Sequence, residues 1–90
     1  MRAKVDGNQK EITRFLRECG CSVFPTHMVK NGFPDLVVGF KGVNYLLELK
    51  DGSKIKCPLT PKEWNFHLTW KGRHEVIYSI EDAVKWIKSI

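Results

Sequence analysis

The sequence predicts an α/β fold of the α+β kind, a small mixed β-sheet flanked by helices, with the element order αβββαβα. Three observations predict it: apolar stripes at helical spacing near both ends, two strand-like runs around Lys41-Gly42, and a helix-start signal at Thr60. The chain has 90 residues, of which 42% are hydrophobic and 28% charged. That length and composition suit one soluble domain with one hydrophobic core, which we expect to span residues 1–90.

The first helix is predicted over residues 8–19, because apolar residues recur there at i, i+3, i+4 and i+7. Gly20 follows it, in the position that commonly ends a helix. A short strand is then expected from Cys21 to Phe24. The apolar residues of the helical stripe are Ile12, Phe15, Leu16 and Cys19.

Residues 34–40 and 43–50 are both rich in strand-forming residues, and only Lys41-Gly42 separates them. This spacing predicts a β-hairpin with a two-residue loop. The hairpin forms the centre of the expected sheet.

The second half of the chain is predicted to hold two helices and one strand. A helix start is indicated by Thr60 as a cap, Pro61 at the first helical position and Glu63 two residues after it, which complete a capping-box pattern. Gly72 is expected to end this helix. A strand over residues 75–79 and a last helix opening at Ser79 complete the order. The last apolar stripe comprises Ile80, Ala83, Val84 and Ile87, and the three tryptophans (Trp64, Trp70 and Trp86) are expected in the core.

Composition excludes several classes of protein. No apolar run is long enough to span a membrane, and residues 1–7 lack the apolar segment of a secretory signal, so we expect a cytoplasmic protein with no membrane partner. The three cysteines lack zinc-site spacing and are expected to be free thiols. The net charge of +5 is compatible with a polyanionic partner but does not by itself identify one.

The predicted pairing of the two hairpin strands brings two carboxylates together. A two-residue loop pairs Phe40 with Val43 and places Asp35 directly across from Glu48, with Cβ atoms about 5 Å apart. Leucines and valines flank both carboxylates. Two carboxylates held together in apolar surroundings require a cation or a shared proton.

Lys50 follows Glu48 by two residues, so its side chain projects from the same face of the strand. Leu49 points to the other face, and its backbone carbonyl lies in the sheet edge between the two functional side chains. Carboxylate oxygens suit Mg²⁺ or Mn²⁺, and a neighbouring ammonium can orient water and offset charge. The pattern therefore predicts metal-assisted cleavage of a phosphodiester bond.

Two further groups are candidates for the same site. Glu11 is expected at the edge of the buried face of the first helix, from which its carboxylate could reach across the sheet face to a metal. A surface glutamate is an equally good interpretation. His27 stands shortly before Pro34-Asp35, although a hydrogen-bonded strand histidine is the more ordinary interpretation.

These residues resemble a known signature. Gly32-Phe33-Pro34-Asp35-Leu36 followed by Glu48-Leu49-Lys50 is similar to the PD-(D/E)XK nuclease motif. The layout, with Leu59-Thr60-Pro61 and the segment 79–83, resembles the stand-alone VRR-NUC domains of phages and bacteria, which are related to the nuclease domain of the Fanconi-associated nuclease. The namesake Val-Arg-Arg run is absent.

The resemblance implies a restriction-endonuclease-like core and a role for each matched residue. Asp35 and Glu48 would bind Mg²⁺ or Mn²⁺, the Leu49 carbonyl would complete the metal shell, and Lys50 would act on the nucleophilic water. Glu11 matches the acidic residue of the family's first helix. Many members carry Gln where this chain has Glu63, so Glu63 is an auxiliary candidate that the capping box already explains.

The implied activity is an intracellular, phage- or bacterium-encoded endonuclease that cuts DNA to leave a 5′-phosphate. We expect selectivity for branched DNA such as flaps or four-way (Holliday) junctions, no small-molecule cofactor, and a homodimer. The alternative is a non-catalytic DNA-binding module of this fold, or a subunit of a larger DNA-processing assembly. Lys54 and Lys56 alternate after the strand that carries Glu48 and could contact successive phosphates, although solvated surface lysines are an equally good interpretation. Three further candidate DNA contacts have no geometric support from the sequence: Arg14, Lys30 and Arg73.

Overall fold

The structure is a computed structural model that describes residues 8–26, 28–29, 31–51 and 59–90. Its element order confirms the predicted αβββαβα arrangement. The elements are α1 (Gln9–Glu18), β1 (Ser22–Pro25), β2 (Leu36–Phe40), β3 (Val43–Leu49), α2 (Pro61–Thr69), β4 (His74–Ile77) and α3 (Ile80–Ser89).

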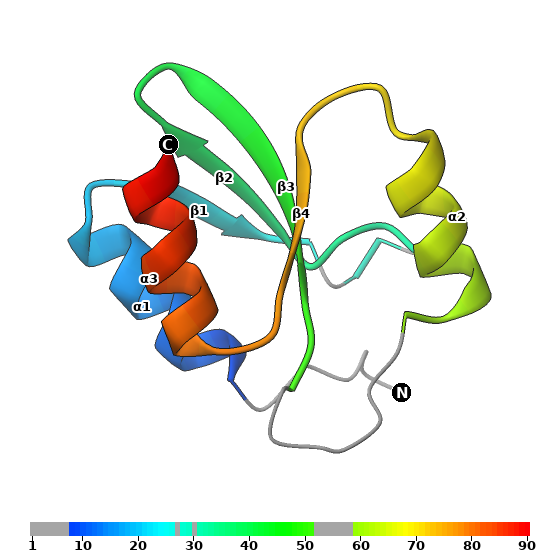
Figure 1. The fold of residues 1–90 in the computed structure, drawn as a ribbon, viewed down its shortest axis with the longest axis horizontal. Helices are drawn as coiled ribbons and strands as arrows, with labels where there is room; N and C mark the ends of the chain where they lie inside the picture. Colours follow the sequence, from blue (N-terminus) through cyan, green and yellow to red (C-terminus); the bar gives the residue numbers. More distant parts are fainter. Residues whose placement is uncertain (1–7, 27, 30, 52–58) are drawn as a thin grey trace.

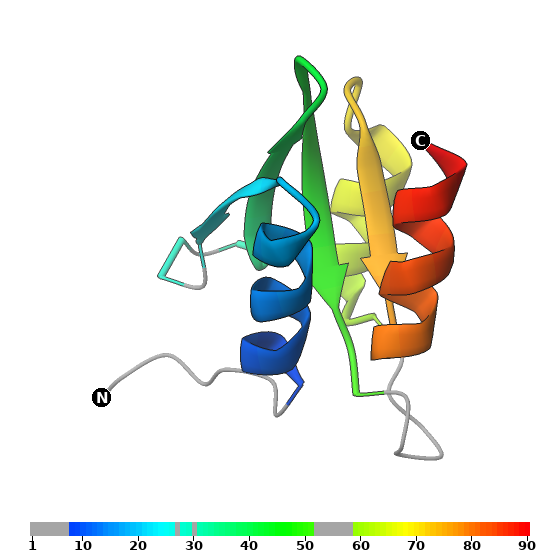
Figure 2. The ribbon, with the colours of Figure 1, turned by 90° about the vertical axis from the view of Figure 1, so that its left-hand side faces the viewer.

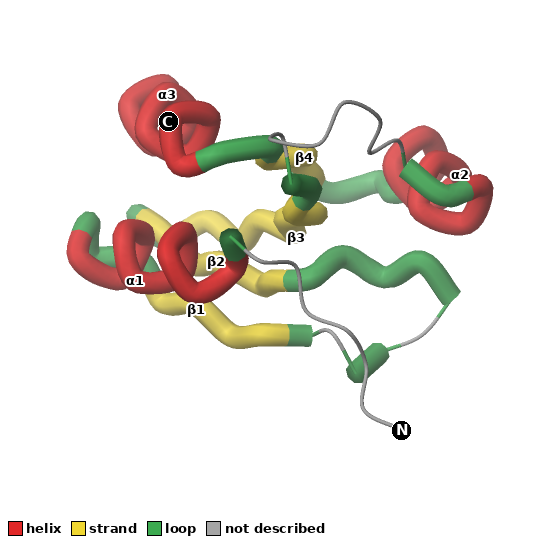
Figure 3. The backbone as a smooth tube through the Cα atoms, turned by 90° about the horizontal axis from the view of Figure 1, so that it is seen from below, coloured by secondary structure: helices red, strands yellow, loops and turns green. Residues whose placement is uncertain are grey.

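The four strands form one mixed sheet in the order β1-β2-β3-β4. β1, β2 and β3 are antiparallel neighbours, whereas β4 runs parallel to β3. Helices α1 and α3 lie together against one face of the sheet, and α2 lies on the opposite side (Figures 1 and 2). The view from below shows the same separation, with β3 and β4 between α3 and α2 (Figure 3).

The hydrophobic core lies between the sheet and the α1–α3 pair. Alternate residues of β2 and β3 point into it, since successive strand side chains face opposite sides. The helices contribute the predicted stripe residues, of which Ile12 and Leu16 are fully buried. The strands supply Leu36, Val38, Leu47 and Leu49, each without exposed surface, and α3 adds Ala83 and Trp86.

Element boundaries differ from the sequence prediction by a few residues. Helix α2 ends at Thr69, because Trp70 adopts an extended conformation (φ −65°, ψ 130°) before Gly72 is reached. Strand β4 begins at His74, one residue earlier than expected, because it pairs with Leu46 of β3. The predicted capping box at Thr60 and Glu63 is present in full.

The expectation that all three tryptophans are buried was wrong for two of them. Trp86 packs in the core with an edge-on contact to Tyr45. Trp64 is 53% exposed and Trp70 44% exposed, because α2 lies away from the core face and its outer surface has no described neighbour. Leu68, on the same helix, is 64% exposed.

None of the described helices combines the length and the apolar character that crossing a bilayer requires. Cys19 and Cys21 are free thiols, as expected. Cys57 lies outside the described residues.

Candidate active site

The predicted hairpin register is confirmed from Phe40 to Leu36, but the predicted direct pairing of Asp35 with Glu48 does not form. Phe40 pairs with Val43 and Leu36 with Leu47, so both strands of the hairpin present the expected faces. The regular ladder ends at that last pair. Asp35, just before β2, donates its backbone amide to the Leu47 carbonyl at 2.9 Å instead of continuing the ladder to Glu48.

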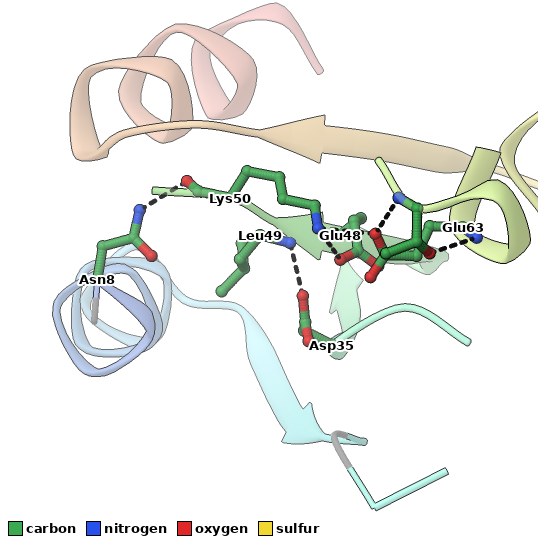
Figure 4. Close-up of polar contacts among 7 residues, drawn as sticks. Asn8, Asp35, Glu48, Leu49, Lys50 and Glu63 are labelled. Carbon is green, nitrogen blue, oxygen red and sulfur yellow. Dashed lines mark hydrogen bonds and ion pairs between the residues drawn. The ribbon is translucent and has the colours of Figure 1, made fainter. Parts of the chain in front are cut away.

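Asp35 is held on β3 by its side chain as well as its backbone. Its Oδ2 accepts a hydrogen bond from the backbone amide of Leu49 at 2.8 Å (Figure 4). The carboxyl groups of Asp35 and Glu48 also lie close enough to interact directly. The two carboxylates that the sequence placed together are therefore adjacent on the sheet face toward α2.

Lys50 and Glu63 complete the cluster. The Lys50 Nζ lies 2.7 Å from Glu63 Oε1 and 3.8 Å from Glu48 Oε2 (Figure 4). Lys50 as a whole is 9% exposed and Glu48 only 3%. The cluster thus holds three carboxyl groups and one ammonium in a largely dehydrated position.

Burial and neighbouring charge change the acid–base properties of this cluster. Burial, together with the charges of Asp35 and Glu63, raises the pKa of Glu48 to about 10. Burial alone would also raise the pKa of Glu63, but the hydrogen bond and positive charge of Lys50 and the Thr60 amide lower it. At neutral pH without a bound cation, Glu48 therefore carries a proton and Glu63 is ionised.

The loop before Asp35 brings α2 to the site. Gly32 adopts a positive φ of 80°, and a Cβ at this position would lie 2.6 Å from the Lys62 carbonyl carbon. Only glycine permits so close an approach in this conformation. Phe33 packs edge-on against Phe66 with ring centroids 5.4 Å apart, so the loop and α2 are held together where Glu63 meets Lys50.

The residues present fit a hard divalent cation. A strand residue's N–H and C=O point to the same side, so the Leu49 amide that bonds Asp35 implies that the Leu49 carbonyl also faces Asp35. Asp35, Glu48 and this carbonyl form an all-oxygen donor set, which suits Mg²⁺ or Mn²⁺. Within the described residues, no three His, Cys, Asp or Glu side chains are already arranged as a metal cage, so water or substrate oxygens would fill the remaining positions.

Glu11 is exposed in the first turn of α1, and no described contact joins it to Asp35 or Glu48, so its role as a metal ligand stays a prediction. Asn8, at the start of the same helix, donates its side-chain amide to the Lys50 carbonyl at 3.1 Å (Figure 4). The end of β3 is therefore adjacent to the start of α1, and Glu11 follows Asn8 by one helical turn.

The candidate DNA contacts fall in different places. Arg14 is exposed on α1. Arg73 precedes β4 at the end of that strand far from Lys50, and its guanidinium lies 5.7 Å from the Tyr45 ring centroid, so the structure does not bring it to the cluster. The remaining candidates, His27, Lys30, Lys54 and Lys56, lie outside the described residues.

Two residues that position the site, Asn8 and Thr26, were not singled out from the sequence, and Gly32 was named only as the first residue of the nuclease-like motif. Asn8 ties α1 to the end of β3, and Gly32 permits the approach of α2. Thr26 holds the Pro34-Asp35 segment: its amide donates to the Asp35 carbonyl and its hydroxyl to the Pro34 carbonyl, both at 2.7 Å. Only Gly32 has a visible sequence signal, since a glycine beside Phe-Pro-Asp indicates a tight approach.

Comparison with known proteins agrees with this architecture. No family model matches the chain, and no curated protein matches it. A search of solved structures finds one described as a VRR_NUC domain, with a TM-score of 0.72, 24% sequence identity and 89% of each chain covered. The chain therefore has the VRR-NUC domain fold, as the sequence resemblance implied.

Proposed function

We propose that this chain is a metal-dependent DNA endonuclease whose active site is Asp35, Glu48 and Lys50. The observation that carries the proposal is the buried cluster itself. Glu48, only 3% exposed, lies against two further carboxyl groups and an ammonium in a domain with the VRR-NUC fold. Such a cluster opposes folding through burial and repulsion, and strongly perturbed carboxyl groups of this kind concentrate at functional sites.

The proposed cofactor is Mg²⁺ or Mn²⁺, held by Asp35, Glu48 and the Leu49 carbonyl. When bound, such a cation lowers the pKa of water and offsets charge on the phosphate. The chain's own contribution is a preformed oxygen donor set. Glu48 would hold the cation as an ionised carboxylate, with its proton released to solvent, because a nearby positive charge favours the ionised form.

Lys50 acts on the reacting groups from the same face. Its ammonium is fixed by Glu63 and directed toward Glu48, so it is preorganised to orient the attacking water and to offset negative charge that develops on the phosphate. Glu63 is a positioning residue, because it acts through Lys50 and also caps α2.

The proposed substrate is branched DNA. In the described residues the site lies at one end of a single small sheet, with no separate element for reading bases. Recognition by backbone geometry is therefore a better fit than recognition of sequence. The alternative of a binding module that does not cut is disfavoured, because Asp35, Glu48 and Lys50 are all present and adjacent.

A substrate panel tests the activity. Labelled four-way junctions, flaps, single strands and linear duplex are incubated with the protein in Mg²⁺, Mn²⁺ or chelator. We expect metal-dependent cleavage of junctions or flaps in preference to linear duplex. Binding of these DNAs without cleavage in either metal would favour the non-catalytic alternative.

We propose that the working unit is a homodimer. One domain of this size offers a small footprint on DNA, and a two-fold pair presents two sites to a pseudo-symmetric junction. The exposed Trp64 and Leu68 of α2 give apolar surface for an interface. Light scattering coupled to gel filtration tests this: we expect twice the chain mass, reduced to one chain mass by Leu68→Glu. A single-chain mass for the unaltered protein, free and on a junction, would contradict the dimer.

A further inference from the structure

A groove lies along α1, on the side of the helix next to the end of β1. It has a volume of about 630 Å³, and its lining residues are Gln9, Lys10, Thr13, Arg14, Arg17, Glu18 and Pro25. None of these residues belongs to the carboxylate–lysine cluster. Ligand pockets commonly have volumes of about 300–1,000 Å³, so the groove is large enough for a nucleotide.

Two of the residues that line the groove carry a buried polar atom without a partner in the described part of the chain. Gln9 is only 5% exposed, and its Oε1 makes no hydrogen bond within the described residues. The hydroxyl of Thr13, one turn further along the same face, is also buried and has no described partner. A buried acceptor without a donor costs folding free energy, so the Gln9 oxygen indicates a ligand or solvent molecule that supplies an N–H or O–H group.

The groove is also cationic. Its lining includes three basic residues, Lys10, Arg14 and Arg17, and a single acidic one, Glu18. All three side chains are exposed, but Arg17 is partly engaged because it donates to the Val23 carbonyl at 2.9 Å. An anionic group on the ligand would therefore meet Lys10 and Arg14.

We infer that this groove binds an unpaired nucleotide of the DNA substrate, an inference that rests on the proposed function. Its three features match the three parts of a nucleotide. The base edge presents N–H donors to Gln9 and Thr13, the base and sugar lie against Pro25 and the aliphatic stems, and the phosphate meets Arg14 and Lys10. In a paired duplex the Watson–Crick donors are already engaged and the base is stacked between its neighbours, so only an unpaired base can present that edge to the groove.

Two chain neighbours of the lining residues contact the backbone of the candidate active site. Asn8, next to Gln9 in sequence, donates to the Lys50 carbonyl. Thr26, next to Pro25, bonds the backbone of Asp35 and Pro34. A strand that passes the carboxylate cluster can therefore place a neighbouring unpaired nucleotide in the groove, which would give selectivity for flaps and junctions.

The test measures DNA binding without cleavage. Fluorescence anisotropy in the presence of chelator compares a labelled blunt duplex with the same duplex bearing a short single-stranded flap. We expect Thr13→Val and Arg14→Gln each to weaken flap binding about five- to tenfold, the loss of one good hydrogen bond, and to change duplex binding less than about twofold. Lys88→Gln, which removes one exposed charge from α3, should change neither.

Either of two results would overturn the inference: equal affinity of the unaltered protein for the two DNAs, or the same loss on both DNAs in the groove variants. Thermal unfolding of each variant confirms that it is folded. Because no metal is present, the result is independent of cleavage. Failure of the protein to cut any DNA would overturn the proposed function alone.

Discussion

The Lys50 ammonium lies 2.7 Å from Glu63 Oε1, and that same oxygen accepts the backbone amide of Thr60 at 2.9 Å. One carboxylate oxygen therefore caps α2 and fixes the lysine of the candidate site. The stability of a surface helix and the orientation of a reactive side chain are coupled through this atom.

The first prediction separates these two roles of Glu63. Glu63→Gln keeps an oxygen acceptor for both Thr60 and Lys50, so it should retain the capping box and keep cleavage within about threefold of the unaltered rate. Glu63→Ala removes both acceptors and should lower the free energy of unfolding by about 1 kcal/mol. Urea unfolding and initial cleavage rates measure the two effects. Complete loss of cleavage in Glu63→Gln would mean that the charge of Glu63 is itself required.

The second prediction concerns Lys50. If its ammonium orients water and offsets charge, Lys50→Ala should lower the cleavage rate by about 10²–10³, the effect of one preorganised electrostatic group. DNA affinity in chelator should fall far less. Single-turnover cleavage and anisotropy give the two values, and equal losses in both would show that Lys50 anchors phosphate instead.

The third prediction concerns the proton on Glu48. A pKa of about 10 in the folded state lies well above the unfolded value of about 4.3. The contribution of Glu48 to stability is therefore most favourable below about pH 4.3 and is lost as the pH rises toward the folded pKa. Glu48→Gln should therefore stabilise the metal-free protein at pH 7–8, on the order of 1 kcal/mol, with the difference shrinking toward pH 4.

Thermal unfolding with and without Mg²⁺ measures this effect. The cation should raise the midpoint of the unaltered protein but not that of Glu48→Gln, because binding to the folded state alone stabilises it. A variant less stable than the unaltered protein in chelator at pH 7–8 would contradict the prediction.

The fourth prediction concerns two histidines that join α2 to β4. His67 Nδ1 and His74 Nδ1 are 2.7 Å apart, so one nitrogen must donate and the other accept. Burial, followed by the charge of His67, lowers the pKa of His74 below its usual 6.5. The unfolded chain therefore binds a proton at His74 more readily than the folded chain does. The stability that neutral His74 contributes is present above about pH 6.5 and is lost as the pH falls through the folded pKa.

His74→Asn keeps a hydrogen-bonding group toward His67 but cannot titrate. The difference in unfolding free energy between this variant and the unaltered protein, followed from pH 8 to pH 5, isolates His74 from the opposite dependence of Glu48. We expect the variant to lose less stability as pH falls. Parallel pH profiles would show that His74 does not titrate differently on folding.

Local signals predicted most of the fold. The hairpin register followed from Lys41-Gly42, and the start of α2 followed from Thr60, Pro61 and Glu63, because turn and capping chemistry is encoded in adjacent residues. The same hairpin brought Asp35 close to Glu48 and Lys50, although Asp35 is held by the Leu47 carbonyl and the Leu49 amide and does not pair directly with Glu48.

Contacts between distant elements were not predictable. Glu63 contacts Lys50 only because the loop around Gly32 packs on α2. A hydrophobic pattern in the sequence does not predict such a contact between distant segments. Trp64 and Trp70 were expected in the core because an amphipathic pattern predicts which side of a helix is apolar. The pattern does not predict which element packs against that side, and α2 lies away from the core face (Figure 1).

The most direct test of the metal-dependent active site is single-turnover cleavage of a labelled branched DNA by Asp35→Asn in Mg²⁺. The substitution keeps an acceptor for the Leu49 amide, so the variant should unfold at a similar temperature to the unaltered protein. We predict cleavage by the unaltered protein in Mg²⁺, none in chelator, and none by the folded variant. Cleavage by Asp35→Asn at close to the unaltered rate, or unchanged cleavage in chelator, would contradict the account.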